Sequence, residues 1–155
     1  IAKYKMWSPF FPNSKKIKSI NTIFNEYPKE SFTIENQNNR VSLFDSESKQ
    51  LDSYDSIQVK HYLTHFNKIN YNQIEFKDSS YIDSVFNLTP HIEFFLSDFD
   101  SKNINVKLWR IKKDQSETGW DKEYGYIKVN DTYELLRVQY FNWDILFKPL
   151  SYFKK

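Results

Sequence analysis

The chain has 155 residues, which suits one domain with a substantial core, because about 68–70% of the unfolded chain's surface can be buried at this size. Its 22 basic and 20 acidic residues give a formal net charge of +2, too balanced to indicate a nucleic acid or a membrane surface as partner. The lack of cysteine excludes disulfides and thiolate sites, and no apolar run approaches the roughly 20 residues that span a bilayer.

The N-terminal residues are predicted to form a strand, a loop and a helix. Apolar and polar residues alternate over residues 1–7, which predicts a strand, and two prolines then predict a loop. A helix is expected from Asn13 or Ser14 up to Pro28, because apolar residues recur at helical spacing. These residues are Ile17, Ile20, Phe24 and Tyr27. The chain begins with Ile1 rather than methionine, so a signal or lipid-anchor segment upstream of it, and the compartment, stay open.

The middle of the chain is predicted to hold a hairpin, two helices and a short strand. Residues 31–45 have two alternating arms around a polar turn. Residues 57–69 place their apolar side chains on one helical stripe, although a strand also fits, and helix is the better choice. A short strand is expected at 71–77 and a short helix at 79–86.

His61 and His65 lie four residues apart, so on a helix they are neighbours at a spacing that can hold a metal ion. They fall away from the apolar stripe, and no Cys, Asp or Glu follows at the spacing of a known zinc motif. We therefore predict that both face solvent, and we expect no metal site and no cofactor.

From residue 91 onward the pattern changes to strands. The expected strands are 91–99, 104–113, 123–129, 132–140 and 143–150. Short connections make them a consecutive antiparallel meander. The predicted fold class is therefore α+β: a single domain, residues 1–155, in which an antiparallel sheet with a C-terminal meander of about five strands packs against two or three helices.

A two-residue turn at Asn130 and Asp131 sets the predicted register of one hairpin in this meander, and pairs Tyr124 with Arg137. One face of the hairpin then carries apolar side chains. The other face is aromatic and basic, with Tyr124, Tyr126, Lys128, Tyr133 and Arg137. Such a face can be a binding surface or a sheet face covered by a helix, and both interpretations stay open.

Residues 122–129, KEYGYIKV, resemble the octapeptide of RNA-recognition motifs in the first basic residue, the third and fifth aromatics and the glycine. Glu123 stands where that motif has glycine, and Val129 stands where it has an aromatic residue. The predicted run of strands also leaves no place for the helices of that fold. An RNA-binding sheet is therefore an alternative, with nucleic acid the less favoured partner.

The only glycines of the chain, Gly119 and Gly125, bracket a segment that holds Trp120 and Tyr124. We expect Gly119 to be the hinge of a loop, and Gly125 to lie on the core face, where it admits a neighbouring ring. Acidic residues flank the two rings, so residues 114–124 are predicted to be a contact loop for another protein. With the aromatic face, the predicted contact residues are Asp114, Glu117, Trp120, Asp121, Glu123, Tyr124, Tyr126, Tyr133 and Arg137.

A non-enzymatic protein-binding role follows from these features. In size and composition alone the chain resembles small bacterial immunity proteins, which neutralise toxins, and accessory lipoprotein domains. The alternative is a carrier of a small ligand, with an aromatic-lined pocket built from Trp109, Tyr126 and Tyr140. The sequence has no glycine-rich phosphate loop, serine elbow or His-Glu helix motif, so no catalytic residue is predicted.

Overall fold

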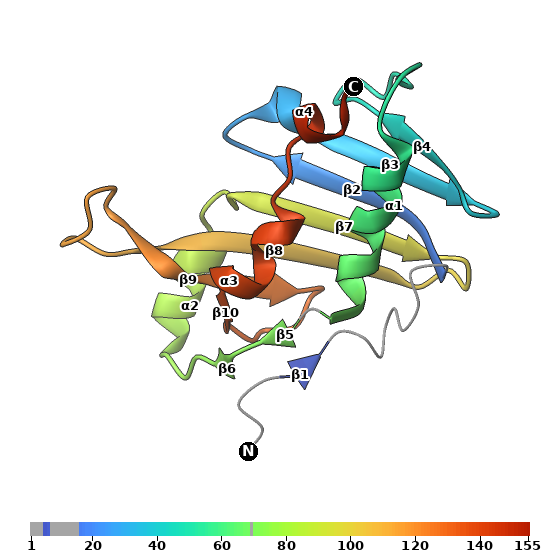
Figure 1. The fold of residues 1–155 in the computed structure, drawn as a ribbon. Helices are drawn as coiled ribbons and strands as arrows, with labels where there is room; N and C mark the ends of the chain where they lie inside the picture. The colour runs from blue at the N-terminus through green and yellow to red at the C-terminus, as the bar shows by residue number, and fades with distance from the viewer. Residues whose placement is uncertain (1–4, 7–15, 69) are drawn as a thin grey trace.

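An antiparallel sheet is the framework of the protein (Figure 1). The computed structural model describes residues 5–6, 16–68 and 70–155, and within them the sheet has eight strands. In spatial order these are β4 (Arg40–Phe44), β3 (Phe32–Gln37), β2 (Ile17–Phe24), β7 (Ile92–Asp98), β8 (Asn103–Lys112), β9 (Trp120–Val129), β10 (Leu136–Gln139) and β6 (Gln73–Ile74). A separate ladder joins β1 (Lys5–Met6) to β5 (Asn70–Tyr71). Strands β7 to β10 follow one another along the chain, which confirms the C-terminal meander.

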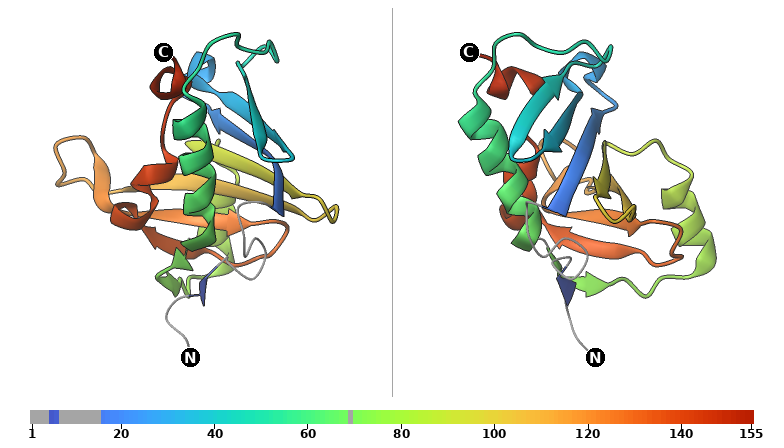
Figure 2. Two further views of the ribbon diagram at one scale, coloured as in Figure 1. Left: turned by 45° about the vertical axis from the view of Figure 1, so that its right-hand side comes forward. Right: turned by 90° about the vertical axis from the view of Figure 1, so that its right-hand side faces the viewer.

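Helices lie on both faces of the sheet (Figure 2), which confirms the α+β class. One face carries α1 (Ser56–Thr64) with a 3₁₀ turn at His65–Lys68, α3 (Tyr140–Trp143) and α4 (Leu150–Phe153), and the other face carries α2 (Ser79–Phe86). The helices predicted at 57–69 and 79–86 are confirmed. Each begins after an aspartate that caps it: the side chain of Asp55 accepts a bond from the Gln58 amide at 3.1 Å, and that of Asp78 from the Tyr81 amide at 2.8 Å.

Aromatic rings fill the main core, between the sheet and the face that carries α1. Phe32, Phe66, Phe94, Trp143 and Phe153 are fully buried there. Several of these rings meet edge to face, as Phe32 and Phe153 do with centroids 5.1 Å apart. A smaller core lies between α2 and the opposite face of β8 and β9, and it consists of Ile82, Val85, Trp109, Tyr126 and Leu135.

Residues 17–24 form strand β2, so the predicted helix from Asn13 or Ser14 to Pro28 is wrong. A β-bulge between Ile17 and Ser19 puts Ile17 and Ile20, three residues apart, on the same buried face, which imitates helical spacing. Beyond the bulge every second residue is buried, but one of them is the polar Thr22, whose hydroxyl bonds that of Tyr62 at 3.2 Å. The loop predicted after residue 7 lies outside the described residues.

The predicted strand at 143–150 is also wrong. This segment forms the end of α3, a 3₁₀ turn at Asp144–Leu146 and the start of α4. Trp143, Leu146, Leu150 and Phe153 are buried, at spacings of three and four residues. Pro149 stands just before α4 and divides this stripe into two short pieces, so no continuous helical pattern is visible in the sequence.

The hairpin at 31–45 is confirmed by β3 and β4, whose turn residues Asn38 and Asn39 have φ of 53° and 64°. The predicted strand at 71–77 is divided between β5 and β6.

The hairpin of β9 and β10 has a different register from the predicted one. Arg137 pairs with Tyr126 rather than Tyr124, so the register is shifted by two residues and the turn is longer. Because side chains alternate with a period of two, this even shift leaves every side chain on the predicted face.

Candidate functional site

The loop between β8 and β9 projects beyond the sheet, as the orange loop at the left of Figure 1 shows. Gly119 has φ of +80°, and its carbonyl accepts a bond from the Lys113 amide at 2.9 Å, which closes the loop. Gly119 therefore supplies the left-handed backbone at which the loop turns into β9. Of the predicted contact residues, Asp114, Glu117 and Glu123 are exposed on or beside this loop.

Trp120 lies at the base of this loop and is half-buried. The guanidinium of Arg110 lies over its ring, 5.5 Å from the centroid. The same guanidinium donates to the Glu26 carboxylate at 2.7 Å and approaches His91 Nε2 at 3.3 Å. Glu26, just after β2, and His91, just before β7, thus hold the guanidinium of Arg110 from β8 over the tryptophan ring.

His91 is half-buried within this group, and its Nδ1 lies 3.6 Å from the Glu26 carboxylate. Burial lowers the pKa of His91 below its usual value, and the positive charge of Arg110 lowers it further, whereas Glu26 opposes both effects. His91 is therefore neutral at neutral pH, and Arg110 is the cation of this group.

A pocket of about 510 Å³ opens beside Trp120, and we call it the Trp120 pocket. Four aromatic residues and three carboxylates line it, together with three other side chains. The aromatic residues are Tyr27, Trp120, Tyr140 and Phe147, the acidic ones are Glu26, Asp121 and Asp144, and the others are His91, Arg110 and Thr118. A smaller pocket of about 210 Å³ shares Glu26, His91, Arg110 and Trp120 with it.

Tyr140 is held against β9 because Gly125 has no side chain. A Cβ at Gly125 would lie 2.9 Å from the Tyr140 hydroxyl oxygen, so the prediction that Gly125 admits a neighbouring ring is confirmed. Burial raises the pKa of Tyr140 to about 12; the charge of Arg110 lowers it, and those of Asp121 and Asp144 raise it.

Two further predicted contact residues, Tyr124 and Arg137, lie side by side on the face of the sheet opposite Tyr140, because Arg137 pairs with Tyr126 and Tyr124 lies two residues before Tyr126 on the same strand. The Arg137 guanidinium stands 4.4 Å from the centroid of the half-buried Tyr124 ring, and its Nε lies 3.2 Å from a Glu75 carboxylate oxygen. Asp121 accepts bonds from the backbone amides of Glu123 and Tyr124, at 2.7 and 2.9 Å. These contacts hold Tyr124, Asp121 and Arg137 in defined positions.

Tyr126 and Tyr133 lie elsewhere, against α2. Tyr126 is 6% exposed and its hydroxyl is 3.0 Å from that of Tyr81, while Tyr133 is 53% exposed and donates to Asp83 at 2.6 Å. Here the aromatic face is a sheet face covered by a helix, and Tyr126 does not belong to the accessible surface. Its ring is likewise closed to the base stacking that the resemblance to RNA-recognition motifs implies.

The predicted ligand pocket of Trp109, Tyr126 and Tyr140 does not form. Trp109 and Tyr126 are paired neighbours beneath α2, whereas Tyr140 packs against Gly125 on the opposite face of the sheet. The sheet itself separates the rings.

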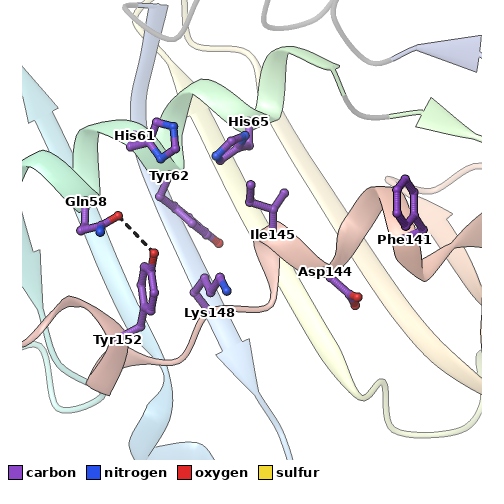
Figure 3. A pocket seen from close by; sticks show the side chains of 9 residues that line it. All are labelled: Gln58, His61, Tyr62, His65, Phe141, Asp144, Ile145, Lys148 and Tyr152. Carbon is purple, nitrogen blue, oxygen red and sulfur yellow. Dashed lines mark hydrogen bonds between the residues drawn. The ribbon is translucent and has the colours of Figure 1, made fainter.

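His61 and His65 line another pocket, of about 320 Å³, between α1 and the C-terminal segment (Figure 3). Their ring centroids are 4.6 Å apart, as the helical spacing requires. Asp144 also lines this pocket, but Figure 3 shows its carboxylate pointing away from both histidines. Among the described residues, no group of three or more His, Cys, Asp or Glu side chains is placed to hold a metal ion.

Glu26, His91 and Arg110 were not predicted to belong to any site, and Tyr140 was predicted only as part of a pocket with Trp109 and Tyr126. They come from distant parts of the sequence, and only the pairing of β2 with β7 and of β7 with β8 brings Glu26, His91 and Arg110 together.

Within the described chain, no helix is both long and apolar enough to cross a membrane. Comparisons with known protein families, characterised proteins and solved structures find no match to this chain.

Proposed function

We propose that this chain is a non-enzymatic protein-binding domain of the immunity or inhibitor kind, and that it engages its partner through the base of the β8–β9 hairpin. The observation that carries the proposal is that two half-buried rings at the loop end of β9, Trp120 and Tyr124, are each held by an arginine guanidinium. Tryptophan, tyrosine and arginine are the residues that dominate binding energy in protein interfaces.

The position of these rings is fixed before any partner arrives. Arg110 is held by Glu26 at 2.7 Å and Arg137 by Glu75 at 3.2 Å, so each guanidinium keeps its ring in place. A side chain that is already ordered loses less rotamer freedom on binding, which strengthens association.

The charge of the loop has a small acidic excess. Residues 112–124 carry four acidic side chains, of which Asp114, Glu117 and Glu123 are exposed, against three exposed lysines, and Lys122 lies 3.8 Å from Glu117. Acidic groups at the rim of an interface mainly raise the association rate with a positively charged partner.

Affinity capture from cells of the source organism, with mass spectrometry, tests the proposal. The baits are the wild type, Trp120→Ala and Phe141→Ala, a matched control because Phe141 is 86% exposed and lies outside the Trp120 pocket. We expect a partner that the wild type and Phe141→Ala enrich equally and that Trp120→Ala loses by about tenfold or more. Equal enrichment by all three baits would reject the proposal.

A further inference from the structure

We infer that the Trp120 pocket receives a basic side chain, a lysine or an arginine, from the surface of the protein partner. This inference rests on the proposed function and specifies its chemistry. The pocket volume of about 510 Å³ is within the range of ~300–1,000 Å³ that ligand pockets occupy, so it has room for one long side chain and part of its backbone.

The charges that line the pocket are unbalanced. Three carboxylates, those of Glu26, Asp121 and Asp144, face one guanidinium, that of Arg110. Arg110 is paired with Glu26 at 2.7 Å, and His91 is the remaining titratable group besides Tyr140. The charges of Asp121 and Asp144 are thus left without a cation in the pocket wall, and a positive ligand would compensate them.

The aromatic residues that line the pocket also favour a cation. Tyr27, Tyr140 and Phe147 present aromatic rings, and aromatic rings attract ammonium and guanidinium groups through their quadrupoles. Arg110 already shows this mode of contact at the same place, since its guanidinium lies between the Trp120 ring and the Glu26 carboxylate. The methylene groups of a lysine or arginine would pack on the rings while the charged end reaches the carboxylates.

Asp121 is oriented before binding. One of its oxygens, Oδ1, accepts both the Glu123 and Tyr124 amides, which fixes the carboxylate at the pocket wall. Burial is the main cause of the raised pKa of Tyr140, and Arg110 lowers it; Asp121 and Asp144 raise it, so both carboxylates interact with the Tyr140 side of the pocket. Asn at these two positions keeps the shape of the side chain and its acceptor oxygen and removes only the charge, so Asp121→Asn with Asp144→Asn is a suitable test variant.

Titration with short blocked peptides, followed by NMR, tests the inference. The probes are acetyl-Gly-Lys-Gly-amide, its arginine analogue, and a norleucine analogue that keeps the methylenes without the charge. The readout is the indole N–H resonance of Trp120, identified by its loss in Trp120→Phe. We expect saturable shifts with the two basic peptides, at least about fivefold weaker binding of the norleucine peptide, and weakening between about 0.02 and 0.3 M salt.

The Asp121→Asn, Asp144→Asn variant is expected to bind the basic peptides about two- to fivefold more weakly. The matched control is Asp131→Asn with Glu134→Gln, an equal charge change at exposed positions of the β9–β10 turn, which should leave binding unchanged. Unchanged spectra elsewhere in each variant verify its fold. Equal binding of the norleucine peptide, or full binding by the Asn variant, would overturn the inference.

The same variants separate this inference from the proposed function. If Trp120→Ala loses the captured partner while the double Asn variant keeps it in full and the basic peptides do not bind, the cation pocket is wrong and the protein-binding role stands. If the basic peptides bind but Trp120→Ala captures the partner as well as the wild type does, the pocket is not a partner contact and both proposals fail.

Discussion

The two halves of strand β9 both carry aromatic rings, but those rings lie in different surroundings. The first half, Trp120 to Tyr124, carries its rings at an open end of the sheet, where arginines hold them half-buried. The second half carries Tyr126 under α2, where the ring is buried with Trp109, Ile82 and Val85. An aromatic strand alone therefore does not indicate a binding surface, because what packs opposite each ring decides whether it is core or contact.

The largest expected difference between the two halves is in stability. Tyr126→Ala should lower the free energy of unfolding by about 3–5 kcal/mol, because it opens a cavity beneath α2. Trp120→Ala should lower it by no more than about 1 kcal/mol, since the ring is half-buried and its contact with Arg110 is a partly exposed cation–π pair.

Urea denaturation followed by circular dichroism measures both values. Tyr126→Phe removes only the hydrogen bond to Tyr81, so it should lower the free energy of unfolding by about 0.5–1.5 kcal/mol. The difference from Tyr126→Ala gives the part of the loss that is due to the cavity. Similar losses for the two alanine variants would mean that both halves are structural.

Alkaline pH provides a second comparison, between Tyr126 of β9 beneath α2 and Tyr140 of α3 at the Trp120 pocket, because burial keeps both tyrosines neutral. Burial raises the pKa of Tyr126 and of Tyr140, in the latter case from 10.0 to about 12. The folded protein therefore holds these protons more tightly than the unfolded chain. The stability that each provides is complete below pH 10 and falls by about 1.4 kcal/mol per pH unit as the pH rises toward the folded pKa.

Urea denaturation at several pH values from 9 to about 12 tests this, with Tyr140→Phe and Tyr126→Phe each expected to show a shallower decline than the wild type. Ultraviolet titration of the phenolates distinguishes the two tyrosines. The Asp121→Asn, Asp144→Asn variant should lower the pKa of Tyr140, whereas the pKa of Tyr126 depends on burial, Tyr81, Glu75 and Arg137 and should not change. Parallel slopes in the wild type and the Phe variants would contradict the prediction.

The elements that were predicted correctly are those whose signals are local. Helix α2 is an example, because Asp78 caps it and its apolar side chains lie one turn apart. The faces of β9 and β10 were predicted even though the register was wrong, because an even shift preserves them. Strand β2 was missed because a bulge and the buried Thr22 remove its alternation, and both depend on the neighbouring strand and on α1.

The candidate site was only partly visible in the sequence. The two glycines in the sequence indicated the segment that holds Trp120. The structure shows that Gly125 is required because a side chain there would collide with Tyr140. The group of Glu26, His91 and Arg110 could not be predicted, because it forms where Phe24 pairs with Ile92 and Ile92 pairs with Leu108. Glu26 follows Phe24, His91 precedes Ile92 and Arg110 follows Leu108, so the order of the strands in the sheet brings all three to the same end.

Substitutions of the two glycines should have smaller effects on the free energy of unfolding. Gly125→Ala should lower the free energy of unfolding by about 1–2 kcal/mol, because the new Cβ would meet the Tyr140 hydroxyl oxygen at 2.9 Å in a packed region. Gly119→Ala should lose about 1 kcal/mol for a different reason: its surroundings are open, but its φ of +80° disfavours a side chain. Gly119→Asn should lose less, because asparagine accepts positive φ more readily. Thermal or urea denaturation checks all three, and a loss from Gly125→Ala that is equally large in a Tyr140→Ala background would contradict the contact.

The smallest effect concerns His91, at the open end of the sheet. Its pKa should lie below 6.5, because burial and the charge of Arg110 disfavour the protonated ring more than Glu26 favours it. A folded pKa below the unfolded one means that the stability from His91 is present above pH 6.5 and is lost as the pH falls through the folded pKa. NMR titration of the imidazole carbon-bound protons measures this pKa directly. Arg110→Gln should raise it, because the variant removes the like charge and leaves Glu26 to interact with His91 alone. A wild-type pKa at or above 6.5 would show that Glu26 dominates and that His91 adds positive charge to the Trp120 pocket near neutral pH.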